Sequence, residues 1–344
     1  MRPVRADSPH DADTCGARLP AGKWSDNESA MSVEPELIVD HPCRLGESPI
    51  WHATENRLYW IDILTGRLFC FDPETSHFRE ILKTASIGAL AIHSTGALLV
   101  FMSDGAVASF NNGALQALPM SVPEQSGFRF NDCVVDPVGR VYSGSIIHKP
   151  GTRSAGARAL RKLHRLLRLP RKTGRVYRFD IDGRVTCVTR GIGRPNGMGI
   201  SPDRSRFYMT DSMARNIYSY DFNEQSGTIA NRRLFVHLPA SAGATPDGLA
   251  VDRCGFVWSA HMHGGCIVRY RPDGIEDRRI RLPTPRVTSL TFGGAAYRDL
   301  YVTTAGGDRR AVYGRTAGAL FRLRPGIDGL PEYPARIPIR PTGS

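Results

Sequence analysis

The stretch GESPIW, from Gly46 to Trp51, leads into a second strand-like run, RLYWIDI, which extends from Arg57 to Ile63. The first run places a glutamate ahead of apolar residues. The segments FNDCVVD, PNGMGIS and PDGLAVD, further along the chain, place an asparagine or an aspartate at the same point. This recurrence indicates that the segments are equivalent parts of a sequence repeat.

Six copies of the repeat can be aligned on the residue at the head of the apolar run. The heads are Glu47, Gly88, Asn131, Asn196, Asp247 and Thr288, and the steps between them are 41, 43, 65, 51 and 41 residues. A second run rich in aromatic and β-branched residues follows each head, and most copies have a third. Repeats of roughly 40 to 50 residues with about four short strands are typical of β-propellers. The sequence therefore predicts an all-β, six-bladed β-propeller, whose ring is closed when the segment 36–40, ELIVD, joins the last blade.

The composition is that of a globular protein, with 41% hydrophobic and 23% charged residues in a chain of 344. No run reaches the roughly 18 apolar residues that a membrane helix needs. The N-terminus lacks the apolar core of a secretory signal. The seven cysteines form no CxxC pair and are odd in number, which favours free thiols and a cytoplasmic location.

The net charge of +12 comes mostly from one segment, residues 149–172, which holds nine Lys/Arg and no acid. Without these nine charges the balance falls to +3, so a nucleic-acid partner is not indicated for the propeller itself. Leu160, Leu163 and Leu167 are at helical spacing, which predicts a basic amphipathic helix inserted in the third blade. This helix could cap the channel mouth, which would suit an anionic substrate, or lie on acidic lipid or nucleic acid, or be a solvated surface excursion.

The predicted organisation has three parts. Residues 1–33 are polar and aperiodic and are interpreted as a disordered leader, with Met31 as a candidate translation start. Residues 34–329 form the propeller, and residues 330–344 form a C-terminal tail. The sequence specifies no oligomeric state.

The first strand of each blade of a propeller lines the central channel, so the heads should form a ring at one end of it. Burying carboxylates and amides together is costly unless a ligand binds them. The donors are all oxygens, which suits Ca²⁺, Mg²⁺ or Mn²⁺ better than structural Zn²⁺. The alternative is that head residues of the types Asn, Asp and Gly only form turns. Four polar heads in one register favour the cation site.

The segments GESPIW…LYWIDI, FRFNDCVVDPVGRVYSGS, RPNGMGISPD and PDGLAVD closely resemble the regucalcin/gluconolactonase (senescence marker protein) family, over about residues 36–325. The resemblance implies a six-bladed propeller with one divalent cation, Ca²⁺ first and Zn²⁺, Mn²⁺ or Mg²⁺ as alternatives. It implies that Glu47, Asn196 and Asp247 are metal ligands and that Asp247 is also the catalytic base. It further implies that Arg129 and Asn131 bind the substrate.

The resemblance implies a hydrolase that opens a small-molecule sugar lactone, of the aldonolactone or gluconolactone type, by attack of a water molecule that the cation activates. The chain departs from the family at Cys133, where glycine is usual. A substrate-binding glutamate expected in the third blade is also missing, since His148 and Lys149 stand there and the next acid is Asp180.

Two other functions remain open at this point. The same metal geometry could serve an organophosphate or aryl-ester hydrolase, and the propeller could bind a cation or ligand without catalysis. His261 and His263 are spaced like a zinc pair, although a third ligand is missing and a packing role is favoured. Asp62 and Asp211 both end second strands, and this repetition favours a structural hydrogen-bonding role.

Overall fold

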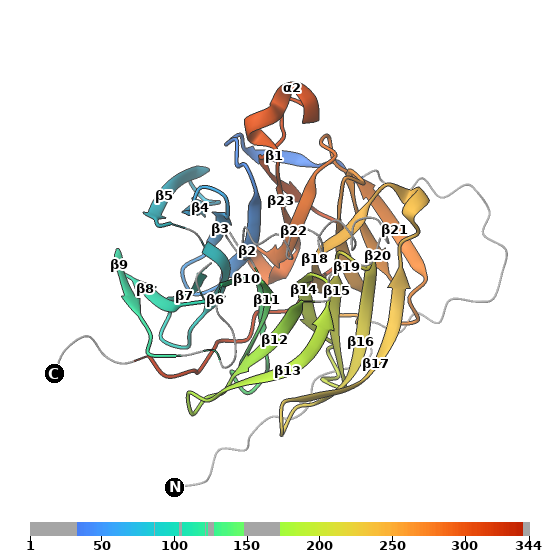
Figure 1. Cartoon of the computed structure of the whole chain (residues 1–344). Helices are drawn as coiled ribbons and strands as arrows, with labels where there is room; N and C mark the ends of the chain where they lie inside the picture. The colour runs from blue at the N-terminus through green and yellow to red at the C-terminus, as the bar shows by residue number, and fades with distance from the viewer. Residues whose placement is uncertain are drawn as a thin grey trace, which may run out of the picture. The chain divides into compact units, whose positions relative to one another are not determined.

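The computed structural model describes residues 33–85, 87–102, 105–120, 122, 127–147 and 173–339. Twenty-four strands in this part of the chain form six antiparallel four-stranded sheets. The sheets are the blades of a six-bladed β-propeller (Figure 1), which confirms the predicted fold class. The leader up to residue 32 and the predicted helical insert at 149–172 lie outside the described residues.

The blades follow one another in chain order, and the innermost strand comes first in each. Blade 1 contains β2 (Gly46–His52), β3 (Arg57–Asp62), β4 (Arg67–Asp72) and β5 (His77–Lys83). Blade 2 contains β6 (Ile87–Ile92), β7 (Leu98–Met102), β8 (Val107–Asn111) and β9 (Ala114–Ala117). Blade 3 contains β10 (Phe128–Val135), β11 (Val141–Ile147), β12 (Gly174–Phe179) and β13 (Val185–Ile192).

The second half of the ring repeats this plan. Blade 4 contains β14 (Pro195–Ile200), β15 (Arg206–Asp211), β16 (Asn216–Asn223) and β17 (Thr228–His237). Blade 5 contains β18 (Thr245–Val251), β19 (Val257–Met262), β20 (Cys266–Tyr270) and β21 (Glu276–Arg281). Blade 6 contains β22 (Val287–Gly293), β23 (Asp299–Thr304), β24 (Leu320–Leu323) and β1 (Glu36–Val39).

The ring is closed by β1, the first strand of the chain. It pairs antiparallel with β24, so that Leu37 lies opposite Phe321. Blade 6 therefore combines strands from both ends of the propeller, as the ELIVD segment predicts. This pairing ties the two ends of the ring together within blade 6.

Burial explains why the inner strands hold their positions. Every residue of β2 and β22 is buried, whereas the outermost strands β5 and β17 are largely exposed. Aromatic residues fill the space between adjacent blades; the rings of Trp51 and Tyr301, for example, stack with their centroids 5.7 Å apart. The inner strands are thus packed against the neighbouring blades on both sides. This packing makes them a rigid frame for side chains that face the channel.

A polar side chain also stabilises the turn after the inner strand in five of the blades. It stands five residues after the head, as His52, His93, Asp136, Ser201 and Asp252. In each case a ring nitrogen, hydroxyl or carboxylate oxygen accepts a hydrogen bond from a backbone N–H of the turn. The repeat thus encodes its turn chemistry along with its strands.

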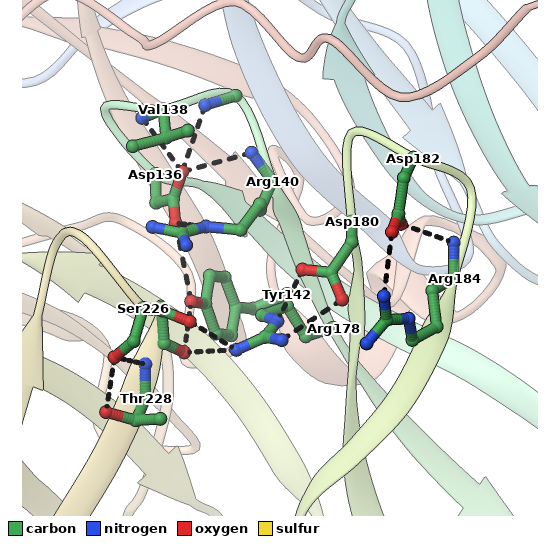
Figure 2. Close-up of polar contacts among 12 residues, drawn as sticks. Asp136, Val138, Arg140, Tyr142, Arg178, Asp180, Asp182, Arg184, Ser226 and Thr228 are labelled. Atoms are coloured by element: carbon green, nitrogen blue, oxygen red, sulfur yellow. Dashed lines mark hydrogen bonds and ion pairs between the residues drawn. The ribbon is translucent and has the colours of Figure 1, made fainter.

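Figure 2 shows one of these turns, in which Asp136 of blade 3 accepts backbone hydrogen bonds and pairs with Arg140. Asp136 accepts three backbone hydrogen bonds of 3.0 Å and pairs with Arg140, whose Nε lies 2.5 Å from Oδ2. Arg140 donates in turn to backbone carbonyls at Glu224 and Gln225, in the turn between β16 and β17. A buried charge pair therefore connects one blade to the next.

The segment after blade 6 crosses one end of the channel. The Ala335 N–H donates to the Ile92 carbonyl at 2.7 Å, and the Arg336 N–H donates to the Gly139 carbonyl at 2.8 Å. Ala335 and Ile337 are buried. Residues 329–337, drawn in red in Figure 1, thus cover the end at which the inner strands finish. The head residues lie at the opposite end. None of the helices in the described part of the chain is long and apolar enough to cross a membrane.

Candidate metal centre and active site

Each of the six inner strands contains a β-bulge, and each bulge lies at or beside the head residue. The pairing of β2 with β3 is interrupted between Glu47 and Ile50, and that of β18 with β19 between Pro246 and Leu249. The other four inner strands are interrupted at the corresponding place. A bulge releases a residue from the ladder and redirects its side chain. The repeat therefore directs five head side chains toward the axis, the sixth head being Gly88.

The structure brings the three predicted metal ligands together. Glu47, Asn196 and Asp247 come from blades 1, 4 and 5 and are 6%, 4% and 6% exposed. Asn196 Nδ2 donates hydrogen bonds to Asp247 Oδ1 and, at 3.1 Å, to Ser212 Oγ. The carboxyl of Glu47 is near enough to that of Asp247 for their charges to interact. Residues 200 positions apart in the sequence thus share one buried polar site.

Burial and mutual repulsion dominate the electrostatics of the two carboxyls. Burial raises the pKa of Asp247 to about 8, despite the opposing charge of Arg194. Burial, followed by the nearby Asp247, raises the pKa of Glu47 well above its usual value. Two ionised carboxylates this close, away from bulk water, repel each other unless a positive charge lies between them. A divalent cation would supply that charge.

The amide side chains of Asn196 and Asn131 also support a cation site. Asn196 uses its Nδ2 for hydrogen bonds within the protein, and its Oδ1 accepts none from the described residues. Asn131 Nδ2 likewise donates to the Pro195 carbonyl at 2.8 Å, which leaves its Oδ1 without a described donor. Both amides therefore have an oxygen available as a ligand. An oxygen-only donor set fits Ca²⁺, Mg²⁺ or Mn²⁺.

A cation at this site depends on such amide oxygens. The described residues contain no group of three or more His, Cys, Asp or Glu side chains arranged to hold a metal ion. The same observation removes support for a zinc pair at His261 and His263. His261 is buried with Nε2 3.3 Å from the Tyr270 hydroxyl, and burial lowers its pKa to about 4. It is a core histidine.

Arg129 and Asn131, the predicted substrate-binding residues, lie beside the carboxyls. Asn131 is buried next to blade 4, and the charge of half-buried Arg129 interacts with Glu47 and Asp247. Burial, with a contribution from Arg194, lowers the pKa of Arg129. Among the described residues, its guanidinium makes one long hydrogen bond, of 3.4 Å, to the Phe130 carbonyl. Its other donors have no acceptor in this part of the chain and could bind a substrate.

The two remaining heads have structural roles. Thr288 donates to the Gly46 carbonyl at 2.6 Å, and its hydroxyl lies 3.0 Å from that of Thr303. A Cβ at Gly88 would lie 2.2 Å from the Phe130 carbonyl oxygen, so only glycine fits there. Blades 6 and 2 thus contribute close packing to the ring, and the free oxygens come from blades 1, 3, 4 and 5.

A second group of acids lies further along the channel, past the heads. Asp132, Cys133 and Glu332 line a cavity between the inner strands that the segment 330–333 closes. Glu332 Oε1 is 3.4 Å from the Thr291 hydroxyl. Asp132 is partly exposed and Glu332 is exposed to solvent, but both side chains face the cavity and not the outer surface. Desolvation, with a contribution from Glu332, raises the pKa of Asp132 to about 7. Cys133 donates its thiol to the Leu90 carbonyl, so the residue that departs from the family pattern lies in this cavity.

Replacing Asp132 by asparagine should flatten the dependence of stability on pH. The folded pKa lies above the unfolded value, so the native state holds more protons between roughly pH 4 and 7, and stability falls as pH rises through that window. The expected loss for the native aspartate is on the order of 2 kcal/mol, below the full shift because channel water screens the charge. Thermal unfolding from pH 4.5 to 8, with a chelator in every sample, measures it. Parallel curves for the two proteins would contradict the assignment.

Asp62 and Asp211 make the structural hydrogen bonds that their repetition predicts. Asp62 accepts from the N–H groups of Arg44 and Leu45 at 2.9 and 3.0 Å. Asp211 accepts from Gly193 and Arg194 at 2.8 and 2.9 Å. Each carboxylate therefore fixes the chain just before an inner strand, immediately above the site.

Sequence reasoning missed four charged residues around the site, Asp132, Arg194, Arg286 and Glu332. The repeat register contained a signal for the two arginines, because each stands two residues before a head, as Arg129 does. Glu332 gave no signal, because it lies beyond the last repeat and reaches the channel through the path of the C-terminal segment.

The fold and the site define the class: a six-bladed β-propeller with polar side chains from several blades gathered at one end of its channel. The chain belongs to the SMP-30/gluconolactonase/LRE-like family, whose model matches residues 45–306. As a member of this family with lactonases among its relatives, it is an enzyme of the lactonase type.

Named relatives span nearly the whole length of the propeller. The chain is 42% identical over 303 residues to the pentonolactonase XacC of Haloferax volcanii, covering 86% of this chain and 96% of the relative. It is 30% identical over 306 residues to the 6-deoxy-6-sulfogluconolactonase of Pseudomonas putida, covering 88% and 98%. A solved regucalcin from Agrobacterium tumefaciens, 22% identical, has the same fold, with a TM-score of 0.74 over 89% of this chain and 98% of that one.

Proposed function

We propose that the protein is a divalent-metal-dependent hydrolase that opens sugar lactones. One observation carries the proposal: the buried carboxyls of Glu47 and Asp247 meet beside the free amide oxygen of Asn196. Such a group is costly in a protein interior and stable around a cation. The pentonolactonase and sulfogluconolactonase relatives support a sugar lactone as the substrate.

The cation would be held by Glu47, Asn196 and Asp247, with Ca²⁺ as the first candidate. When bound, it supplies Lewis acidity to the lactone carbonyl and makes water more acidic. These three side chains would hold the cation in place, because the rigid inner strands fix them.

The surrounding side chains perform the remaining steps. Asp247 accepts the proton of the attacking water at a carboxylate oxygen. Arg129 and Asn131 orient the sugar hydroxyls and the developing negative charge on the carbonyl oxygen by hydrogen bonds. Ring opening then releases the hydroxy acid. The site needs no nucleophilic side chain, in keeping with a Cys133 thiol whose pKa burial raises.

A pH-indicator assay over a panel of aldonolactones tests this function. We expect acid release with at least one pentono- or hexonolactone, loss of nearly all of it on chelation with EDTA, and recovery when Ca²⁺, Mn²⁺, Mg²⁺ or Zn²⁺ is restored. The reason is that the two carboxylates cannot replace the electrophile that the cation provides.

The controls separate this function from its alternatives. Aryl esters and an organophosphate in the same assay identify a hydrolase of another class. Activity on lactones that is indifferent to EDTA would remove the cation from the reaction. Tight cation binding without hydrolysis of any substrate would replace the enzyme with a binding protein.

A further inference from the structure

Three arginines stand at the same position of the repeat, two residues before the head. They are Arg129, Arg194 and Arg286, in blades 3, 4 and 6. Arg194 and Arg286 come immediately before β14 and β22, and Arg129 is the second residue of β10. Because the inner strands run from the heads toward the closed end of the channel, the arginines lie on the side of the heads away from that end. They form a rim at its open mouth.

The charges of this rim converge on one carboxyl. Asp247 lies on blade 5, between the blades that carry Arg194 and Arg286, and all three arginines act on its charge. Arg194 and Arg129 also act on each other as like charges. Three guanidinium groups thus surround the place where a substrate would enter.

The rim arginines interact with Glu47 and Asp247 only at longer range than an ion pair. Among the described residues, neither Arg129, Arg194 nor Arg286 forms an ion pair, whereas Arg178 and Arg269 elsewhere in the propeller have carboxylate oxygens at 2.7 and 2.8 Å. The Nε atom of Arg286 is buried and has no hydrogen-bond partner in the described part of the chain. An unpaired donor in such a place is costly unless a ligand accepts from it.

Neighbouring residues hold the rim in position. The guanidinium of Arg286 lies over the Tyr313 ring, 4.9 Å from its centroid, at the end of the short helix α2 (Arg310–Tyr313). The backbone of Arg194 is fixed by its 2.9 Å hydrogen bond to Asp211. Arginines that are fixed yet unpaired are organised for an external anion.

The balance of charges around the site also favours an anionic ligand. Glu47 and Asp247 together carry the two negative charges that a divalent cation neutralises. Asp132 and Glu332 line the cavity on the other side of the heads, and neither is among the charges that act on Arg129. The three guanidinium charges at the mouth therefore exceed the single charge that develops on a neutral lactone during ring opening. A substrate with a permanent anionic group would use this excess.

We propose that Arg194 and Arg286, with Arg129, form an anion subsite that selects lactones bearing a second, negatively charged group remote from the lactone carbonyl. A carboxylate, as in an aldarolactone, or a phosphate would satisfy it, because both accept forked hydrogen bonds from guanidinium. The inference rests on the proposed lactonase function and specifies its substrate class.

Matched lactone pairs test the subsite. D-glucaro-1,4-lactone and D-glucono-1,4-lactone share ring and configuration and differ in the charge at carbon 6, and 6-phosphogluconolactone tests phosphate. We expect wild-type kcat/KM to favour the charged lactones. Arg194→Gln and Arg286→Gln should each lower the ratio of charged to neutral kcat/KM by about 10- to 100-fold, the value of a charge-assisted hydrogen bond. Lysine at either position should retain part of the ratio, and added salt should lower it.

Controls keep the possible failures apart. Arg298→Gln, an exposed arginine paired with Asp328, should leave the ratio unchanged. Calorimetry with the open-chain dianion D-glucarate, compared with D-gluconate, measures the subsite without turnover and should show weaker glucarate binding in the two glutamine variants. Both products carry the carboxylate that ring opening releases, so the comparison isolates the second charge.

Each outcome has one meaning. Hydrolysis of neutral lactones with a charged-to-neutral ratio near one, unchanged in the variants, overturns the subsite and leaves the lactonase function standing. Failure to open any lactone, with glucarate binding that depends on Arg194 and Arg286, overturns the lactonase function and supports the subsite.

Discussion

Replacing Asp247 by asparagine should lower kcat/KM for the best lactone by about a thousand-fold or more, equivalent to roughly 4 kcal/mol of transition-state stabilisation. In the proposed site the variant would lose one of the two charges that hold the cation, and it would lose the proton acceptor as well. Glu47→Gln removes the other charge but not the acceptor, so its activity should recover further when the cation concentration is raised. Steady-state kinetics at several Ca²⁺ concentrations, with calorimetric Ca²⁺ binding, measure both effects.

Asp221→Asn is the matched control, because Asp221 is an exposed carboxylate that pairs with Arg233 on the outer part of blade 4. It should keep wild-type turnover and cation affinity. Wild-type turnover in either Asp247→Asn or Glu47→Gln would rule out the assignment of these two carboxylates to the metal centre.

The largest effect on stability is expected at Asp136, away from the site. Asp136→Ala would leave the buried Arg140 charge without its partner and three backbone N–H groups of the turn without their acceptor (Figure 2). Loss of one partner from a buried ion pair costs about 3–5 kcal/mol, which for a domain of this size corresponds to a fall in Tm of about 10 °C. Thermal unfolding measured by circular dichroism gives the value.

The same figure contains the comparison. Asp182 pairs with Arg184 at 3.0 Å on the surface, with more than half of each side chain exposed, so Asp182→Ala should leave Tm nearly unchanged. The Asp136 variant should retain kcat per folded molecule at low temperature, since this network is separate from the site. Equal shifts in Tm for the two variants would show that burial of the Asp136 pair is not what stabilises the turn.

These predictions distinguish two positions that recur in the repeat. Asp136 and Asp252 stand five residues after a head and hold turns together, whereas Asp247 is itself a head. Residue type does not distinguish them, because all are buried aspartates. Position in the repeat does, since it decides whether a side chain faces the turn or the channel.

The sequence by itself determined the number of blades, the inner strand of each, and the closure of the ring by β1. Strand periodicity and turn residues are local signals, and six repetitions make them strong. It also indicated the heads, because equivalent positions of a closed repeat must lie on one ring. Glu47 and Asp247 could be grouped on that ground alone.

Only the tertiary structure decided what each head does and what surrounds it. The Thr288 hydroxyl donates to a backbone carbonyl of the neighbouring blade, whereas Asn196 Oδ1 has no donor among the described residues. Glu332 reaches the channel from beyond the last repeat. Whether a polar group is satisfied or available depends on contacts between blades that are far apart in the sequence, and no local pattern contains that information.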